Sequence, residues 1–249
     1  MLIAQKTCLS GQILWRVRRQ NIATSKISII IPVLNEARIL PTTLAKAQLG
    51  TDVEVIVVDG GSQDSTVKLV QSLGIRVLVV RVAGRGGQMN AGAKVATGEI
   101  LLFLHADTLL PSGFDALVRQ ALKQPGAVAG AFELRIDGSL LGLRLVEYGV
   151  NWRSRWLQMP YGDQAIFLKT GLFRTIDGFP QLPVMEDFEL MRRLRRQGRI
   201  ITLSVPVLTS GRRWQKLGVL KTTLINQIAI TAYFLGVPPK RIAHWYYRQ

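Results

Sequence analysis

The stretch "GEILLFLHADTLLPSG", residues Gly98 to Gly113, contains an apolar run that ends abruptly in polar side chains. Residues Ile100 to Leu104 are all suited to burial, and His105 and Asp107 follow directly, separated by one alanine. A strand that is apolar at every position is typical of a parallel sheet covered by helices on both faces. Ligands of such sheets bind beyond the carboxyl ends of the strands, so a functional site is expected at His105 and Asp107.

The same alternation of apolar strands and helical patterns occurs upstream of this stretch. Strands are predicted in "KISIIIPV", "VEVIVVD", "IRVLVVRV" and "EILLFLHAD", with helices between them. Pro41 predicts that the first of these helices is either broken or starts late. The fold class is therefore α/β, doubly wound, with a mainly parallel sheet and helices on both faces. Residues 32–36, 59–64 and 105–107 are expected at one edge of this sheet.

Composition limits the classes of partner. The chain has 249 residues, 48% of them hydrophobic, and its 32 basic and 16 acidic side chains give a formal net charge of +16. This excess favours nucleic acid, anionic lipid or a phosphorylated substrate. Because the sequence has neither zinc-finger spacing nor a ribonucleoprotein aromatic motif, no nucleic-acid partner is expected. A single cysteine, Cys8, and the lack of a secretory signal pattern predict a cytoplasmic location.

A glycine-rich run follows the third predicted strand. "AGRGGQMNAGA", Ala83 to Ala93, lacks the G-x-G-x-x-G spacing of dinucleotide-binding folds. It predicts a flexible loop that carries Arg85 into a short helix with Asn90, suited to approach a nucleotide. Asp107 after an apolar strand is suited to hold Mg²⁺ or Mn²⁺ beside a diphosphate. His105 is either a second ligand, a hydrogen-bonding group or only the end of the strand.

Four motifs carry a resemblance to a known family. The four motifs are "SIIIPVLNEARIL", "VIVVDGGSQDST", "GRGGQMNAGAKVATGEILLFLHADT" and "MEDFELMRRLRRQG". In their order and spacing, these motifs resemble those of the family-2 glycosyltransferases, which have the GT-A fold. The likeness extends from Ser28 to about Trp214. The variants "LHADT" and "YGDQAIF" resemble a small bacterial subgroup whose acceptors are mostly unassigned.

The resemblance also implies a division of the chain. It predicts an N-terminal basic segment over residues 1–24 and a GT-A domain over residues 25–214. The nucleotide-binding half of that domain is expected at about 25–110 and the acceptor half at about 111–214. Residues 215–249 are expected to form a C-terminal helical segment with an aromatic and basic tail.

The resemblance further implies which residues bind the donor. Asp107 matches the metal-binding aspartate of the family's DxD motif, and His105 stands where the first aspartate of that motif usually stands. Arg212, Arg213 and Trp214 resemble the end of an arginine-tryptophan motif that lies near the donor phosphates in larger relatives. The other donor-binding positions implied are Pro32, Asn35, Glu36, Asp59, Gly61, Arg85, Asn90 and Ala106. Asp59 is expected against the base, although an aspartate before two glycines also commonly ends a strand.

A carboxylate is also needed to accept the proton of the acceptor hydroxyl. Glu186 and Asp187 resemble the ED motif of the family, whose aspartate is the catalytic base. Asp163, in "YGDQ", is the rival base. The helix dipole also favours acidic residues in the first turn of a helix. Asp187 therefore has a structural alternative, in which it stabilises the helix start and is not a catalytic base.

The leading hypothesis is a metal-dependent, inverting glycosyltransferase that moves a sugar from a nucleoside diphosphate to an acceptor hydroxyl with Mn²⁺ or Mg²⁺. The alternatives are a nucleotidyltransferase and a non-catalytic basic protein that binds nucleic acid or anionic membrane. Arg16 to Arg19 and the tail "PPKRIAHWYYRQ" suit the headgroup region of a bilayer, which predicts peripheral membrane binding and a lipid-linked acceptor. A helix over Val219 to Val237 is expected to be buried, interfacial or part of an oligomer contact.

Overall fold

A computed structural model describes residues 3–9, 12–18, 25–81 and 84–246, with the backbone alone given before residue 25. Strands β1 (Ile3–Leu9) and β2 (Gln12–Arg18) pair antiparallel. The side chains of the N-terminal basic segment, those of Arg16 to Arg19 among them, lie outside the described part of the chain. The expectation that these arginines contact a membrane therefore stays a prediction.

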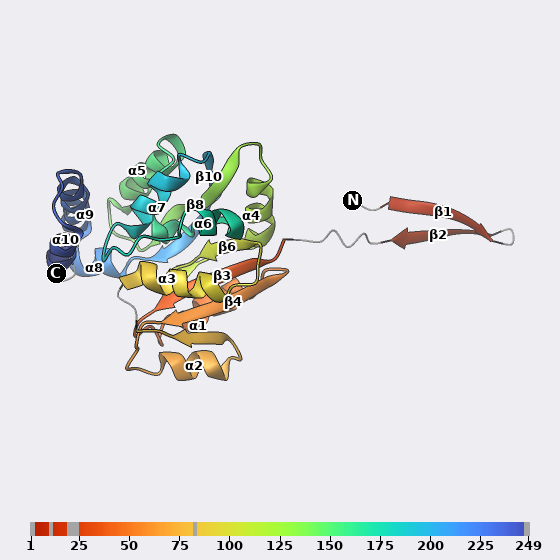
Figure 1. Cartoon of the computed structure of the whole chain (residues 1–249), viewed down its shortest axis with the longest axis horizontal. Coiled ribbons are helices and arrows are strands. Elements are labelled where there is room, and N and C mark those ends of the chain that lie inside the picture. The colour runs from red at the N-terminus through yellow and green to blue at the C-terminus, as the bar shows by residue number, and fades with distance from the viewer. Residues whose placement is uncertain (1–2, 10–11, 19–24, 82–83, 247–249) are drawn as a thin grey trace.

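The body of the molecule is built on one mixed sheet with the strand order β5-β4-β3-β6-β9-β8-β10-β7 (Figure 1). The first four strands in this order, β5, β4, β3 and β6, are parallel. Strand β9 pairs antiparallel with β6 and β8, and β7 pairs antiparallel with β10. The strands are β3 (Ile27–Val33), β4 (Val53–Asp59), β5 (Arg76–Val79), β6 (Ile100–Phe103), β7 (Thr108–Leu109), β8 (Ala127–Asp137), β9 (Phe167–Lys169) and β10 (Arg199–Ser210).

Helices cover both faces of this sheet, as the apolar strands predict. Ile29 and Ile31 of β3 join a core with helices α1, α2, α4 and α5, whereas Ile30 between them joins a second core with α3, α6 and α7. This alternation confirms that the strands are buried on both sides. The helices are α1 (Leu40–Ala47), α2 (Thr66–Ser72), α3 (Gly84–Val95), α4 (Phe114–Leu122), α5 (Leu143–Trp156), α6 (Thr170–Thr175), α7 (Glu186–Leu194), α8 (Arg212–Leu217), α9 (Val219–Phe234) and α10 (Pro239–Tyr246), with a 3₁₀ turn η1 over Gly162–Gln164.

The glycine-rich run is helical rather than a flexible loop. Helix α3 begins at Gly84, so Arg85 lies in its first turn and the predicted loop is wrong for the described residues of this run. Gly86 permits the arrangement, because a Cβ atom there would lie 3.2 Å from the carbonyl oxygen of Pro180 and 3.3 Å from Cβ of Glu186. The start of α3 thereby packs directly against the start of α7. Helix α1 begins only at Leu40, which confirms the late start that Pro41 predicts.

Strand β10 is not indicated by the sequence patterns, yet it organises the site. It pairs parallel with β8 and antiparallel with β7, with Thr209 opposite Thr108. Their hydroxyl oxygens lie 2.9 Å apart, and the backbone N–H of Ser210 donates to the carbonyl of Asp107 at 3.1 Å. The chain that leaves β10 is therefore fixed beside Asp107.

The C-terminal helices α8, α9 and α10 form the left end of the molecule in Figure 1. Ala229 and Ile242 pack with Val184 in a small core that is separate from the two sheet cores. The helix expected over Val219 to Val237 is α9. Among the described residues, no helix combines the length and apolarity needed to span a bilayer.

Candidate active site

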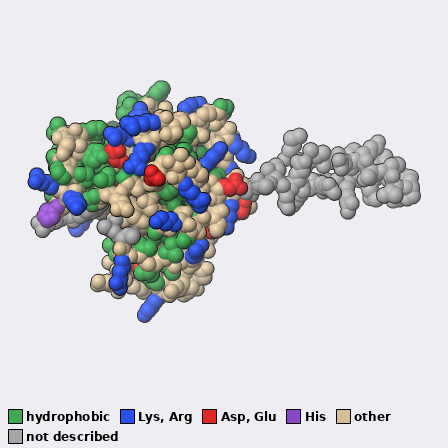
Figure 2. Space-filling model, viewed as in Figure 1, with side chains coloured by type: hydrophobic (Ala, Val, Ile, Leu, Met, Phe, Trp, Pro, Cys, Tyr) green, Lys and Arg blue, Asp and Glu red, His purple; other side chains and the backbone are tan. Residues whose placement is uncertain are grey.

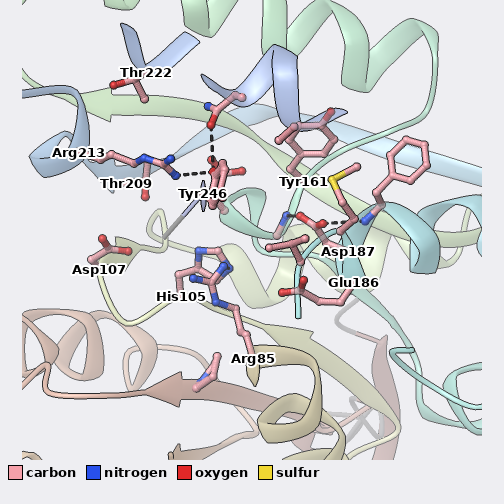
Figure 3. A pocket seen from close by; sticks show the side chains of 18 of the residues that line it. Arg85, His105, Asp107, Tyr161, Glu186, Asp187, Thr209, Arg213, Thr222 and Tyr246 are labelled. Carbon is pink, nitrogen blue, oxygen red and sulfur yellow. Dashed lines mark hydrogen bonds between the residues drawn. The ribbon is translucent and has the colours of Figure 1, made fainter. Parts of the chain in front are cut away.

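A cavity of about 350 Å³ opens beyond the carboxyl ends of β3 and β6 (Figure 3). Most of the residues singled out by sequence line it, although they come from distant parts of the chain. These are Pro32, Glu36, Arg85, His105, Ala106, Asp107, Asp163, Glu186, Asp187, Arg213 and Trp214. The cavity thus joins the ends of β3 and β6 with the start of α7 and with the helices that follow β10.

Arg212 links two acids at one side of this cavity. Its Nη2 lies 3.0 Å from Oδ2 of Asp107 and 3.3 Å from Oε2 of Glu36. Although burial opposes it, the pKa of Arg212 is raised by the hydrogen bond to Asp107 and by the negative charge of Glu36. The side chains are a quarter to a half exposed, so the pairing is accessible to an incoming ligand.

The residues present fit a divalent cation that takes most of its ligands from a substrate. Among the described residues, no cluster of three or more His, Cys, Asp or Glu side chains is arranged to hold a metal ion. Mg²⁺ and Mn²⁺ commonly bind through one or two carboxylates together with phosphate oxygens and water. Asp107 supplies one such carboxylate, and the guanidinium of Arg212 beside it shows that this position accepts a positive group.

The surroundings of His105 favour the neutral imidazole. Burial, and secondly the positive charge of Arg85, lower its pKa well below the usual range. Nη1 of Arg85 lies 3.4 Å from Nε2 of His105, with the guanidinium as donor. The hydrogen-bonding alternative for His105 therefore has a partner in the structure.

Asp187 is fixed at the start of α7 with its carboxylate toward the cavity. Met185, which precedes the helix, has a left-handed backbone with φ 65°, a conformation that non-glycine residues adopt at a cost. The backbone N–H of Gly162 donates to Oδ2 of Asp187 at 2.7 Å, and that of Phe188 donates to Oδ1 at 2.7 Å. The turn η1 and the helix start thus hold one carboxylate from two sides.

The two neighbouring acids bind protons more readily than usual. Burial, and secondly the charge of Asp187, raise the pKa of Glu186 to about 7. Burial raises the pKa of Asp163 to about 6, although the positive charge of Arg153 opposes the shift. Oδ1 of Asp163 is buried and has no hydrogen-bond partner among the described residues. Asp187 has a backbone donor on each of its two carboxylate oxygens.

Five of the predicted donor-binding residues do not line this cavity: Asn35, Asp59, Gly61, Asn90 and Arg212. Asp59 is fully buried at the end of β4, where its Oδ1 accepts from the N–H groups of Gly61 and Ser62 at 2.8 and 2.9 Å. Oδ2 of Asp59 is buried without a hydrogen-bond partner in the described part of the chain. Asn35 Oδ1 accepts from the N–H of Gln63 at 2.8 Å and so joins the loops after β3 and β4.

Asn90 is occupied elsewhere. Its Nδ2 donates to the carbonyl of Phe179 at 2.8 Å, and its Oδ1 accepts from the N–H of Phe179 at 3.0 Å. This pair of bonds fixes α3 to the loop before α7. The structure therefore gives Asn90 a scaffolding role and does not bring it into the cavity, because both ends of its amide are bonded to backbone.

Several lining residues are not found by sequence reasoning. Tyr161 lies next to the predicted "GDQ" residues, and Arg153 stacks 3.4 Å above its ring. Thr222, Asn226 and Tyr246 come from α9 and α10. The Tyr246 hydroxyl is hydrogen-bonded to Arg213 and donates to Oδ1 of Asn226 at 3.0 Å. Only the proximity of Tyr161 to Asp163 gives a local signal, since the other three depend on how the last helices pack.

Comparisons with known proteins give the family and the fold of the chain. The family model of glycosyl transferase family 2 matches residues 28–180. A PGL/p-HBAD biosynthesis glycosyltransferase of Mycobacterium tuberculosis is 31% identical over 222 residues, which cover 82% of this chain and 82% of the relative. An undecaprenyl-phosphate 4-deoxy-4-formamido-L-arabinose transferase of an Enterobacter species is 34% identical over 101 residues, 36% of this chain and 31% of the relative.

Solved structures support the fold. A mannosyltransferase of Pyrobaculum calidifontis, in complex with GDP-Man and Mn²⁺, has a TM-score of 0.60 and 23% identity. The match covers 74% of this chain and 56% of the mannosyltransferase chain, so this chain spans little more than half the length of that relative. Glucosyl-3-phosphoglycerate synthase of Mycobacterium tuberculosis, in complex with Mn²⁺, UDP and phosphoglyceric acid, has a TM-score of 0.57 and 20% identity. The match covers 87% of this chain and 80% of the synthase chain. The family match, the ordered motifs and the sheet together show that the chain belongs to glycosyl transferase family 2 and has the GT-A fold.

Proposed function

We propose that this protein is a metal-dependent, inverting glycosyltransferase that moves a sugar from a nucleoside diphosphate to an acceptor hydroxyl. The observation that carries the proposal is the presence of Asp107 and Asp187 in the wall of one cavity. Inversion requires a base on the acceptor side and charge neutralisation on the leaving-group side. Two separately anchored carboxylates in one cavity supply these two requirements.

Each carboxylate has its own part in the proposed reaction. When bound at Asp107, Mn²⁺ or Mg²⁺ supplies positive charge that stabilises the departing diphosphate. Asp187 accepts the proton of the acceptor hydroxyl while its two backbone donors keep the carboxylate oriented. Glu186, which lies next to it, remains partly protonated near neutral pH because its pKa is about 7. Asp187 is therefore the preferred base, with Asp163 as the rival.

The donor is proposed to extend from this cavity toward the end of β4. Arg85, Arg212 and Arg213 place positive charge around the position of the diphosphate, and Trp214 lines the same wall. Asp59 and the linked loops after β3 and β4 are proposed to receive the nucleoside, as the family resemblance implies. The two structural relatives support this class of donor, since their complexes contain GDP-Man or UDP.

Peripheral binding to an anionic membrane, with a lipid-linked acceptor, is a further part of the proposal. Helix α5 exposes an apolar ridge formed by Leu145, Tyr148, Trp152 and Trp156, and Leu141 is exposed just before the helix. In Figure 2, hydrophobic side chains lie at the upper edge of the molecule, where Figure 1 places α5. Tryptophan and tyrosine favour the bilayer interface, and the net charge of +16 favours anionic lipid.

A screen of sugar nucleotides for thermal stabilisation, with and without Mn²⁺, tests the proposed activity. A true donor together with Mn²⁺ is expected to raise the melting temperature more than the sugar nucleotide alone or Mn²⁺ alone does, because the donor and the metal bind the folded state together. Mass spectrometry of reactions with that donor then detects transfer or slow hydrolysis. If no nucleoside diphosphate sugar stabilises the protein at any Mn²⁺ concentration, the proposal is wrong.

A further inference from the structure

The cavity has a second, largely apolar region that the proposed donor does not use. Its walls on this side are formed by Val184 and Phe188 near the start of α7, Ala229 and Ile230 of α9, and Ile242 of α10. Val184, Ala229 and Ile242 are almost completely buried. A nucleoside diphosphate offers no apolar group of matching size to this surface, whereas both Asp107 and the arginines lie at the polar side.

Helix α9 separates this region from the outside of the molecule. Ala229 and Ile230 line the cavity, while Ile228 is 48% exposed and does not. The helix is therefore apolar on its cavity side and also partly apolar on its outer side. Ile230 is partly exposed at the cavity, so an apolar ligand there would remove its side chain from water.

A polar group of fixed geometry stands at the boundary between the two regions. The Tyr246 hydroxyl is bonded to Arg213 and Asn226, and the Arg213 guanidinium lies 4.2 Å from the centre of the Tyr246 ring. Figure 3 shows Tyr246 and Arg213 on one side of the cavity, with Asp187 and Glu186 on the other.

We infer that this apolar region is the acceptor subsite and that the acceptor carries its reactive hydroxyl on an apolar body. The inference rests on the proposed function, because it assigns Asp187 as the group that meets the hydroxyl. The body packs against Ile230 on the cavity side of α9, and the hydroxyl end extends toward Asp187. Burial of the apolar body holds the acceptor, while the polar side of the cavity is left to the donor.

Binding of a matched pair of probes tests the inference without any need for turnover. Octyl β-D-glucopyranoside, kept below its micelle concentration, and free D-glucose share the hydroxyls of carbons 2, 3, 4 and 6. The octyl glucoside has an apolar chain in place of the hydrogen of the anomeric hydroxyl. Isothermal titration and saturation-transfer NMR are carried out on the full chain, with and without Mn²⁺ plus UDP or GDP. The octyl glucoside is expected to bind at least about tenfold more tightly than glucose. Equal affinities would overturn the inference.

Two variants and a matched control locate the binding. Ile230→Ser makes the wall polar and Ala229→Leu fills the space, so each is expected to weaken octyl glucoside binding by about tenfold. Ile228→Ser makes the same chemical change on the outer side of α9 and is expected to leave the affinity unchanged. If the Ile228 variant weakens binding as much as the Ile230 variant, or if neither pocket variant weakens it, the subsite is wrong.

Nucleotide binding separates this inference from the proposed function. The affinity of UDP or GDP with Mn²⁺ is measured on the same variants, and no change is expected, since the altered side chains lie away from Asp107. A protein that binds octyl glucoside in this region but no nucleotide would contradict the proposed function alone. A protein that binds nucleotide with Mn²⁺ but does not distinguish the two probes would contradict the acceptor subsite alone.

Discussion

The guanidinium of Arg212 lies 3.0 Å from the carboxylate of Asp107, although 105 positions separate the two residues in sequence. The contact depends on β10, which pairs with the strand that follows Asp107 and ends two residues before Arg212. Arg212 also contacts Glu36, so one positive group is shared by two acids. A divalent cation at Asp107 must therefore compete with this guanidinium, and a donor diphosphate offers Arg212 another partner.

Removal of this guanidinium is expected to strengthen the binding of metal alone. In Arg212→Gln, Asp107 loses its competing positive charge, and the Mn²⁺ affinity without nucleotide is expected to rise about three- to tenfold. Electron paramagnetic resonance of free Mn²⁺ measures this directly. In the presence of a nucleoside diphosphate the variant is expected to bind the nucleotide less tightly, because a phosphate contact is lost. A weaker affinity for Mn²⁺ alone would show that Arg212 does not compete at this position.

Asp107→Asn is expected to remove most activity and the Mn²⁺-dependent part of donor binding. A neutral amide is a poor ligand for a hard cation that bridges two phosphates. Asp107 is partly exposed, so the melting temperature is expected to change little. Asp137→Asn, at an exposed position at the end of β8, is the control for the same chemical change. Full turnover in the Asp107 variant would mean that the metal assignment is wrong.

Asp187→Asn is expected to lower the rate constant of transfer by about 10² to 10⁴, with donor affinity little altered. The asparagine keeps the shape of the side chain but does not accept the proton. Steady-state kinetics together with donor titration separate the two effects. If Asp163→Asn gives this kinetic pattern and Asp187→Asn does not, Asp163 is the base.

Glu186 is expected to make the folded state less stable as the pH rises. Its pKa is raised by burial to about 7 from an ordinary value of 4.5, so the folded protein favours the protonated carboxyl. The stability that this preference gives is complete below about pH 4 and is lost as the pH rises through about 7. Relative to wild type, Glu186→Gln is expected to gain about 1–3 kcal/mol in unfolding free energy at pH 8 and little at pH 4.

Urea unfolding of both proteins between pH 4 and pH 8 checks this expectation. Asp163 also lowers the unfolding free energy as the pH rises, but over a lower pH range, since its pKa is raised from 3.8 to about 6. Some pH dependence therefore remains in the Glu186 variant. A difference between the two proteins that is the same at every pH would contradict the raised pKa of Glu186.

Membrane association is tested by flotation with liposomes of rising anionic lipid content, at low and high salt. Trp152→Ser with Trp156→Ser is expected to reduce the bound fraction at low salt severalfold, because interfacial aromatic side chains are removed. Leu73→Ser, at an exposed leucine beside α2, is the control at a distant part of the surface. Wild-type protein that stays at the bottom of every gradient would leave a soluble acceptor as the better explanation.

The parallel half of the fold was predictable from local patterns, but the assembly of the site was not. Apolar runs before Asp59 and Asp107 identified two strand ends, because burial on both faces leaves a continuous pattern. In β10, Pro206 interrupts the run at a register shift, and this hides the strand that places Arg212. Tyr246 and Ile242 reach the cavity only through the packing of α10 on α9. Such long-range packing has no period in the sequence.

The hydrogen bonds between the loops after β3 and β4 have a thermodynamic consequence. Asn35, with φ 56°, accepts from Gln63, and its own N–H donates to the hydroxyl of Ser62 at 2.8 Å. Gln88 donates to the carbonyls of Val33 and Val58, which ties the ends of both strands to α3. The loss of conformational entropy at these loops therefore occurs during folding. A nucleoside that binds there meets a preorganised surface, so a larger share of its contact energy remains as affinity.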